Sequence, residues 1–132
     1  MKRVHLYRDG RWIAGPLDQA ETFREKNRGL LGRDALDPGT GMVIERCGMI
    51  HTWFMRFPID VMFLSRRGRV VKVRHEVKPF RIACAPFAHR TVEMPAGLAH
   101  ELGLERGQSV ELRNEGPGAG GVGDDLDGGR EA

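Results

Sequence analysis

Apolar and polar residues alternate over short stretches along most of this chain, which is the pattern of β-strands with one buried face. Val4 and Leu6 alternate with charged neighbours, and Asp9-Gly10 supplies a turn before Trp12-Ile13. This arrangement predicts an opening β-hairpin. Further strands are predicted at residues 42–44, 51–57, 61–64, 69–77, 90–94 and 109–113.

Two segments carry the signals of short helices. Thr22 and Glu25 have the spacing of a capping box, and the helix that they predict runs to Gly32. Pro95 opens a second predicted helix, which ends at Gly103.

The connections between the predicted strands are of hairpin length, and the helical crossovers that a parallel sheet requires are missing from the pattern. Residues 37–41 and the segment from Pro79 to Pro86 read as loops. We therefore expect a mainly β protein, a small antiparallel β-barrel or sandwich with about seven short strands and two short helices.

The charge of the chain is divided unevenly between a body and a tail. The 132 residues carry a net charge of +3, and residues 115–132 hold five acids, one base and seven of the 18 glycines. Such a composition buries too little apolar surface to offset the entropy of ordering the backbone. We expect one domain over residues 1–114 with a net charge of +7, followed by a disordered acidic tail.

Patterns for export and membrane insertion are weak. The longest apolar stretch, Ile82–Ala88, has seven residues, far fewer than the roughly 18 to 20 of a membrane-spanning helix. The first residues, MKRVHLYRDGRW, lack an apolar signal region. We expect a cytoplasmic protein without a membrane partner, in which Cys47 and Cys84 are free thiols.

The segment HTWFMRFPID at residues 51–60 places ionisable side chains within an apolar run. If this segment floors a pocket, Trp53 offers an apolar wall, His51 a proton donor or acceptor and Asp60 a carboxylate. The alternative is a core strand in which Asp60 accepts backbone donors or pairs with Arg56. The sequence leaves both interpretations open.

Other chemistries have little support. The histidines and cysteines lack the paired spacing of metal ligands, so we predict neither a metal nor a cofactor. The serines and cysteines stand outside known nucleophile motifs. Basic residues are spread over the body, and the one tight cluster, Arg66-Arg67-Gly68-Arg69, reads as a solvated hairpin tip. This distribution argues against a nucleic-acid interface.

Several motifs together resemble the bacterial and archaeal family called domain of unknown function 192. They are RGLLGR at 28–33, HTWFMRFPIDVMFL at 51–64 and VEMPAGLAHELGLERGQSV at 92–110. The resemblance implies a small β-barrel or jelly-roll-like fold and implies no reaction. Phe54 stands where the family pattern has Trp, and Arg56 where it has Lys.

These observations lead to one main hypothesis about function and two alternatives. The main hypothesis is a binding module for a small anionic or aromatic ligand, with a pocket formed by Arg28, His51, Trp53, Met55, Arg56 and Asp60. The first alternative is an enzyme that uses His51 and Asp60 as an acid–base pair. The second is an adaptor that binds protein or nucleic acid through its basic outer face. The oligomeric state is not assigned.

Overall fold

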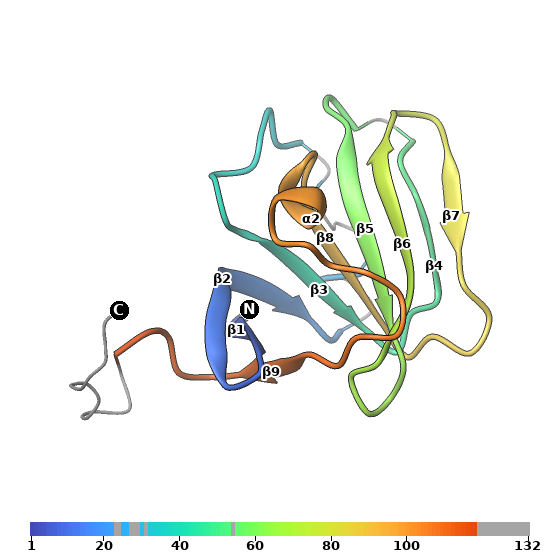
Figure 1. Ribbon diagram of the computed structural model, residues 1–132. Coiled ribbons are helices and arrows are strands. Elements are labelled where there is room, and N and C mark those ends of the chain that lie inside the picture. The colour runs from blue at the N-terminus through green and yellow to red at the C-terminus, as the bar shows by residue number, and fades with distance from the viewer. Residues whose placement is uncertain (23–24, 27–29, 31, 54, 119–132) are drawn as a thin grey trace.

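The computed structural model describes residues 1–22, 25–26, 30, 32–53 and 55–118. A seven-stranded sheet has the order β6-β5-β8-β3-β2-β1-β9, and β4 and β7 form a second, two-stranded sheet (Figure 1). The strands are β1 Lys2–Arg8, β2 Arg11–Ala20, β3 Gly41–Glu45, β4 Met49–His51, β5 Ile59–Leu64, β6 Val70–Val77, β7 Ile82–Cys84, β8 Arg90–Pro95 and β9 Glu111–Arg113. All paired strands are antiparallel except β2 and β3.

The opening hairpin is confirmed. Asp9 and Gly10 connect β1 to β2 and both adopt left-handed backbone angles, with φ of 53° and 75°. Two consecutive residues of this kind match the right-handed twist of the strands that they join. β2 is longer than the pattern suggests, because it continues to Ala20 and pairs there in parallel with β3.

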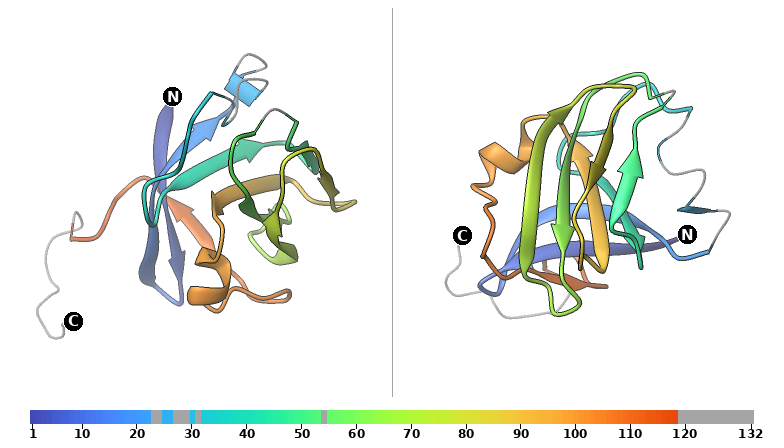
Figure 2. Two further views of the ribbon diagram at one scale, coloured as in Figure 1. Left: turned by 90° about the horizontal axis from the view of Figure 1, so that it is seen from above. Right: turned by 90° about the vertical axis from the view of Figure 1, so that its right-hand side faces the viewer.

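The large sheet curls, so that β1 and β2 cross β5, β6 and β8 steeply (Figure 2). A first core cluster fills the inside of this curl, together with α2, Leu98–Glu101. Its largest members are Leu6, Leu17, Val43, Met62, Leu64, Val92 and Met94. This cluster joins the two halves of the sheet.

A second core cluster separates the two sheets. Ile50 on β4 and Ala83 on β7 pack there with residues of β3 and β5. On β5, the side chains of Ile59, Val61 and Phe63 belong to this second cluster, whereas those of Met62 and Leu64 belong to the first. β5 is therefore buried on both faces, and a side chain's parity along the strand decides which core it enters.

Of the two expected arrangements, barrel or sandwich, the barrel is not confirmed, because the sheet does not close. The edge strands β6 and β9 are not paired with each other, and within the described residues an isolated bridge between Arg69 and Ser109 connects the segments that precede them. β9 has only three residues and is already hydrogen-bonded to β1. So short a strand leaves the sheet open.

The two expected helices are not both confirmed. Among the described residues the structure gives bounds for one short helix, α2. The capping box is present, since Thr22 Oγ1 accepts the Glu25 N–H at 3.1 Å and Glu25 Oε1 accepts the Thr22 N–H at 3.2 Å. Most of the predicted helix, at 23–24, 27–29 and 31, lies outside the described residues.

No helix in the described part of the chain is long and apolar enough to cross a membrane.

The predicted strand over residues 51–57 is wrong. β4 ends at His51, and the next residue, Thr52, bonds a neighbouring loop through its hydroxyl, which donates to the Lys78 carbonyl at 2.6 Å and accepts the Arg81 N–H at 2.8 Å. The chain then turns, with the Met55 N–H bonded to the Thr52 carbonyl. The segment expected as a loop between Pro79 and Pro86 instead contains β7.

β6 occupies nearly the predicted range, but its valines do not share one face. Irregularities in the β5–β6 register put Val73 beside the first core cluster and Val77 in the second. Such bulges insert an unpaired residue and reverse the alternation beyond it.

At the end of the domain, Tyr7 donates its hydroxyl to the Glu115 carbonyl at 2.8 Å. The disordered tail stays a prediction, because residues 119–132 lie outside the described residues.

Candidate functional site

The two-stranded sheet presents one side to the second core and the other to solvent. Its register pairs Met49 with Cys84, Ile50 with Ala83 and His51 with Ile82. Because the central pair is buried and strand side chains alternate, the other two pairs point outward. These outward residues form what we call the outer face, namely Met49, His51, Ile82 and Cys84.

Three rings lie at one end of the outer face. The ring centroids of His51 and Trp53 are 5.9 Å apart and those of Trp53 and Phe80 are 6.3 Å apart, both with an edge-to-face orientation. The Trp53 backbone N–H also donates to His51 Nδ1 at 3.2 Å. Edge-to-face contacts at this spacing are favourable, so the three side chains support one another although each is exposed.

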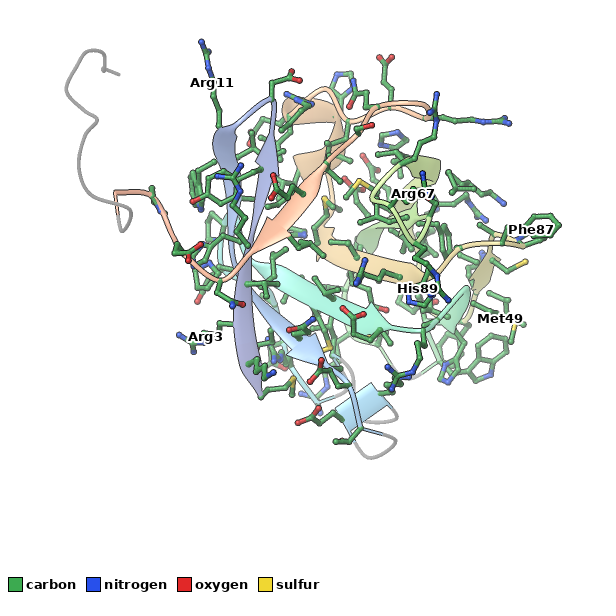
Figure 3. All side chains as sticks on the ribbon, turned by 90° about the horizontal axis from the view of Figure 1, so that it is seen from below. Arg3, Arg11, Met49, Arg67, Phe87 and His89 are labelled. Carbon is green, nitrogen blue, oxygen red and sulfur yellow. The ribbon has the colours of Figure 1, made fainter. Side chains whose placement is uncertain are left out.

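Exposed apolar side chains are concentrated around this sheet. The described residues include seven large exposed apolar side chains, and five of them lie on or beside β4 and β7. We call these five the apolar surface: Met49, Trp53, Phe80, Ile82 and Phe87. The ring of Phe87 is 97% exposed, and Figure 3 shows it projecting from the same side of the molecule as Met49. Large exposed apolar side chains that gather on one side of a protein are typical of interaction sites.

The loops on either side of β7 hold two of these aromatic residues in unusual backbone conformations. Phe80 has φ of 64° and Phe87 has φ of 73°. A bulky side chain disfavours the left-handed region, and residues held there cluster at functional sites. Both rings are thus set on the surface by backbone conformations that are unusual for a bulky side chain; the other described non-glycine residues with positive φ, Asp9, Arg46 and Glu76, carry polar side chains.

Of the residues singled out in the sequence, the structure brings His51 and Trp53 together. Met55 is buried in the second core cluster. Arg56 forms an ion pair with Asp34, from Nη1 to Oδ1 at 2.6 Å, and both side chains are largely exposed. Arg28 lies outside the described residues.

Asp60 is fully buried and has a structural set of contacts. Its Oδ1 accepts the Glu76 N–H at 2.8 Å, and its Oδ2 accepts the N–H groups of Gly97 and Ala99 at 3.0 and 2.9 Å. These bonds hold a bulge of β6 and the start of α2 against β5. This is the arrangement that the alternative interpretation of the sequence described, in which Asp60 accepts backbone donors.

His51 and Asp60 do not meet. Asp60 has the same parity along β5 as Met62, so it faces the first core, whereas His51 lies on the solvent side of the β4–β7 sheet. The second core cluster and the thickness of the large sheet stand between them. The acid–base pair considered in the sequence is therefore not assembled.

A buried carboxyl group that the sequence analysis passed over lies on β8. Glu93 is 5% exposed and faces Met42 across one ladder and Val61 across the other. Its carboxyl group has no hydrogen-bond donor within the described residues. Burial raises the pKa of Glu93 to about 7, and the charge of nearby Arg33 opposes part of that rise. The sequence signal that could have identified Glu93 is its position among apolar residues in a predicted strand.

The basic cluster of the β5–β6 hairpin borders a cavity of about 290 Å³, which Arg66, Arg67 and Arg90 line. Arg90 is already held by Glu45, with Nε at 2.8 Å from Oε1. Gly68 forms the turn with φ of 88°, and an added Cβ there would overlap the Val110 carbonyl oxygen. The hairpin is thus packed against the chain segment directly before β9.

Two solved crystal structures share the fold. A protein of unknown function from Novosphingobium aromaticivorans is 23% identical, with 83% of each chain covered and a TM-score of 0.73. A Sinorhizobium meliloti protein described as a "putative transcription regulator" is 23% identical, with 84% of this chain and 92% of that chain covered and a TM-score of 0.74. No curated protein matches the chain. Residues 5–112 match the family described as Uncharacterized ACR, domain of unknown function 192.

Proposed function

The chain belongs to the domain of unknown function 192 family, and from that premise we propose that it is a binding module that holds an aromatic ligand on the outer face of β4 and β7. The observation that carries the proposal is the concentration of exposed large apolar side chains in the apolar surface. Leaving such side chains in water is unfavourable by roughly 25 cal/mol per Å² of apolar area. A ligand that covers them recovers that free energy.

Trp53 and Phe80 are the two residues that suit a flat aromatic ligand best. Their edge-to-face contact holds both rings in place before any ligand binds. A preformed site loses less conformational entropy on binding than one that must order its side chains. An aromatic group that stacks on either ring adds about 0.5 to 1.5 kcal/mol beyond the area that it buries.

His51 adds a polar contact at the edge of this surface. Its Nδ1 accepts the Trp53 N–H, so the neutral ring carries its proton on Nε2. That N–H is a donor for a phenol, carbonyl or carboxylate oxygen of the ligand. The proposal therefore keeps two residues of the predicted pocket, His51 and Trp53, and adds Phe80.

The two tryptophans of the chain provide a direct test. Trp53 is 38% exposed on the apolar surface, and Trp12 is 36% exposed on the opening hairpin. We would titrate 2-naphthamide, a neutral flat aromatic molecule, and follow both indole N–H signals by ¹H–¹⁵N NMR. The Trp53 signal is expected to shift and saturate, while Trp12 stays in place as an internal control.

A variant pair sharpens the result. Phe80→Asn removes the ring with a residue that tolerates a positive φ, and we expect it to weaken the affinity at least fivefold. Trp12→Phe should leave the affinity unchanged. Equal, unsaturating shifts of both indole signals, or unchanged affinity in Phe80→Asn, would refute the proposed site.

A further inference from the structure

A cavity of about 490 Å³ lies beside β6, outside the apolar surface. Residues of β6 line one side, Ala85 and Pro86 after β7 line another, and the chain at 104–106 that follows α2 lines a third, so that the cavity opens to solvent. Figure 1 shows this chain passing in front of β6 on its way from α2 to β9. The volume falls within the roughly 300 to 1,000 Å³ of ordinary small-molecule sites.

One part of the cavity wall is apolar. Val71 and Val73 contribute from β6, and Pro86 and Leu104 contribute from the two loops. β6 is the edge strand of the large sheet, and its Val70 already bonds the chain before β9, donating its N–H to the Gln108 carbonyl at 2.8 Å. The cavity thus offers an apolar body site beside the edge of the sheet.

The charged groups at the cavity are mainly basic. Lys72, His75 and Arg106 line it, against the single acid Glu105. Lys72 Nζ donates to the Cys84 carbonyl at 2.9 Å, which places the ammonium group between β6 and β7. None of the five ion pairs among the described residues includes Lys72 or Arg106. Lys72 and Arg106 thus both line this cavity, and within the described residues neither forms an ion pair.

We propose that this cavity binds a small organic carboxylate, with its apolar body against Val71 and Pro86 and its carboxylate at Lys72 and Arg106. An ionised acceptor makes hydrogen bonds about twice as strong as a neutral one. Arg106 can engage both carboxylate oxygens, and Lys72 supplies a second charge. This site is separate from the aromatic site proposed above, and either stands without the other.

A matched pair of ligands isolates the charge. 2-Naphthoate and 2-naphthamide have nearly the same shape, and only the first is an anion. We would titrate both into the full chain and follow the backbone amides of residues 71–73 and 104–106 by ¹H–¹⁵N NMR. We expect 2-naphthoate to shift these signals and to bind there at least tenfold more tightly than 2-naphthamide.

Variants then test the two cations. In Lys72→Gln/Arg106→Gln the preference for the carboxylate is expected to fall to about one. In Lys2→Gln/Arg46→Gln, which removes the same charge from positions that line none of the cavities described above, the preference should persist. Both variants alter side chains that reach solvent, and a dispersed spectrum verifies that each is folded.

Three other outcomes would each contradict one of the two proposed sites or the role of its cations. Shifts from 2-naphthoate only at Met49–Trp53 would remove the cavity site and leave the aromatic site standing. A preference unchanged in Lys72→Gln/Arg106→Gln would show that these cations do not recognise the anion. Shifts at 71–73 together with an unresponsive Trp53 would instead support the cavity and refute the aromatic site.

Discussion

Glu93 makes the stability of the fold depend on pH in a way that one substitution isolates. Its pKa is raised from 4.5 to about 7, mainly because burial removes the carboxylate from water. Between these two values the folded chain holds a proton at Glu93 that the unfolded chain has released. The resulting stabilisation is complete below about pH 4.5, and it is lost as the pH rises through about 7.

The magnitude follows from the size of the shift. A difference of one pKa unit corresponds to 1.36 kcal/mol, so the free energy of unfolding should fall by about 2 to 3 kcal/mol between pH 5 and pH 8 because of Glu93. Glu93→Gln has nearly the same shape and does not titrate. Its stability relative to the wild type should therefore rise by about the same amount across this range.

Urea unfolding of the two proteins at several pH values measures this difference directly. The comparison cancels every other titrating group, since each pH value yields a difference between two chains that are otherwise identical. Glu101→Gln, at an exposed position on α2, should show a nearly constant difference. If Glu93→Gln also shows a constant difference from pH 5 to pH 8, the carboxyl group is not desolvated and the reasoning fails. Arg33→Gln should move the transition to higher pH, because the positive charge of Arg33 opposes the rise.

Two further substitutions test the contacts that shape the site. Asp60→Asn should lower the free energy of unfolding by about 2 to 4 kcal/mol in urea at pH 7, because the buried Asp60 carboxyl group accepts three backbone N–H groups. The exposed Asp34→Asn should cost under about 1 kcal/mol, and equal effects would contradict a structural role. Thr52→Val should lower the free energy of unfolding by about 2 kcal/mol, because it leaves the Lys78 carbonyl and the Arg81 N–H without their hydroxyl partner. Thr52→Ser keeps the hydroxyl and should keep most of that stability. An equal loss in both variants would contradict the role of the hydroxyl.

The candidate site shows which of its residues can be recognised from the sequence and which cannot. His51 and Trp53 stood out because they interrupt an apolar run, and they do lie together. Phe80 comes from a segment that read as a loop, so its contact with Trp53 could not be foreseen. Asp60 was correctly singled out as unusual, but its environment depends on backbone donors from β6 and the start of α2, which only the folded chain supplies.

The cavity beside β6 could not be predicted from the sequence. The pattern places Lys72 on the polar side of an amphipathic strand, and Arg106 is one of many basic residues in the chain. They line the same cavity because the path of the chain after α2 brings residues 104–106 beside β6. Sequence periodicity reports which way a side chain points along its own strand, and it carries no information about which distant segment covers it.

The sequence by itself determined the mainly β class, the opening hairpin and the family, because alternation, turn residues and local motifs are short-range properties of the chain. Only the tertiary structure decided that the sheet stays open, that β7 pairs with β4, and that His51 and Asp60 lie on opposite sides of a core. These outcomes depend on contacts between segments far apart in the chain, such as the bond from Thr52 to Lys78. The free energy of such contacts exists only once the fold has brought the partners together.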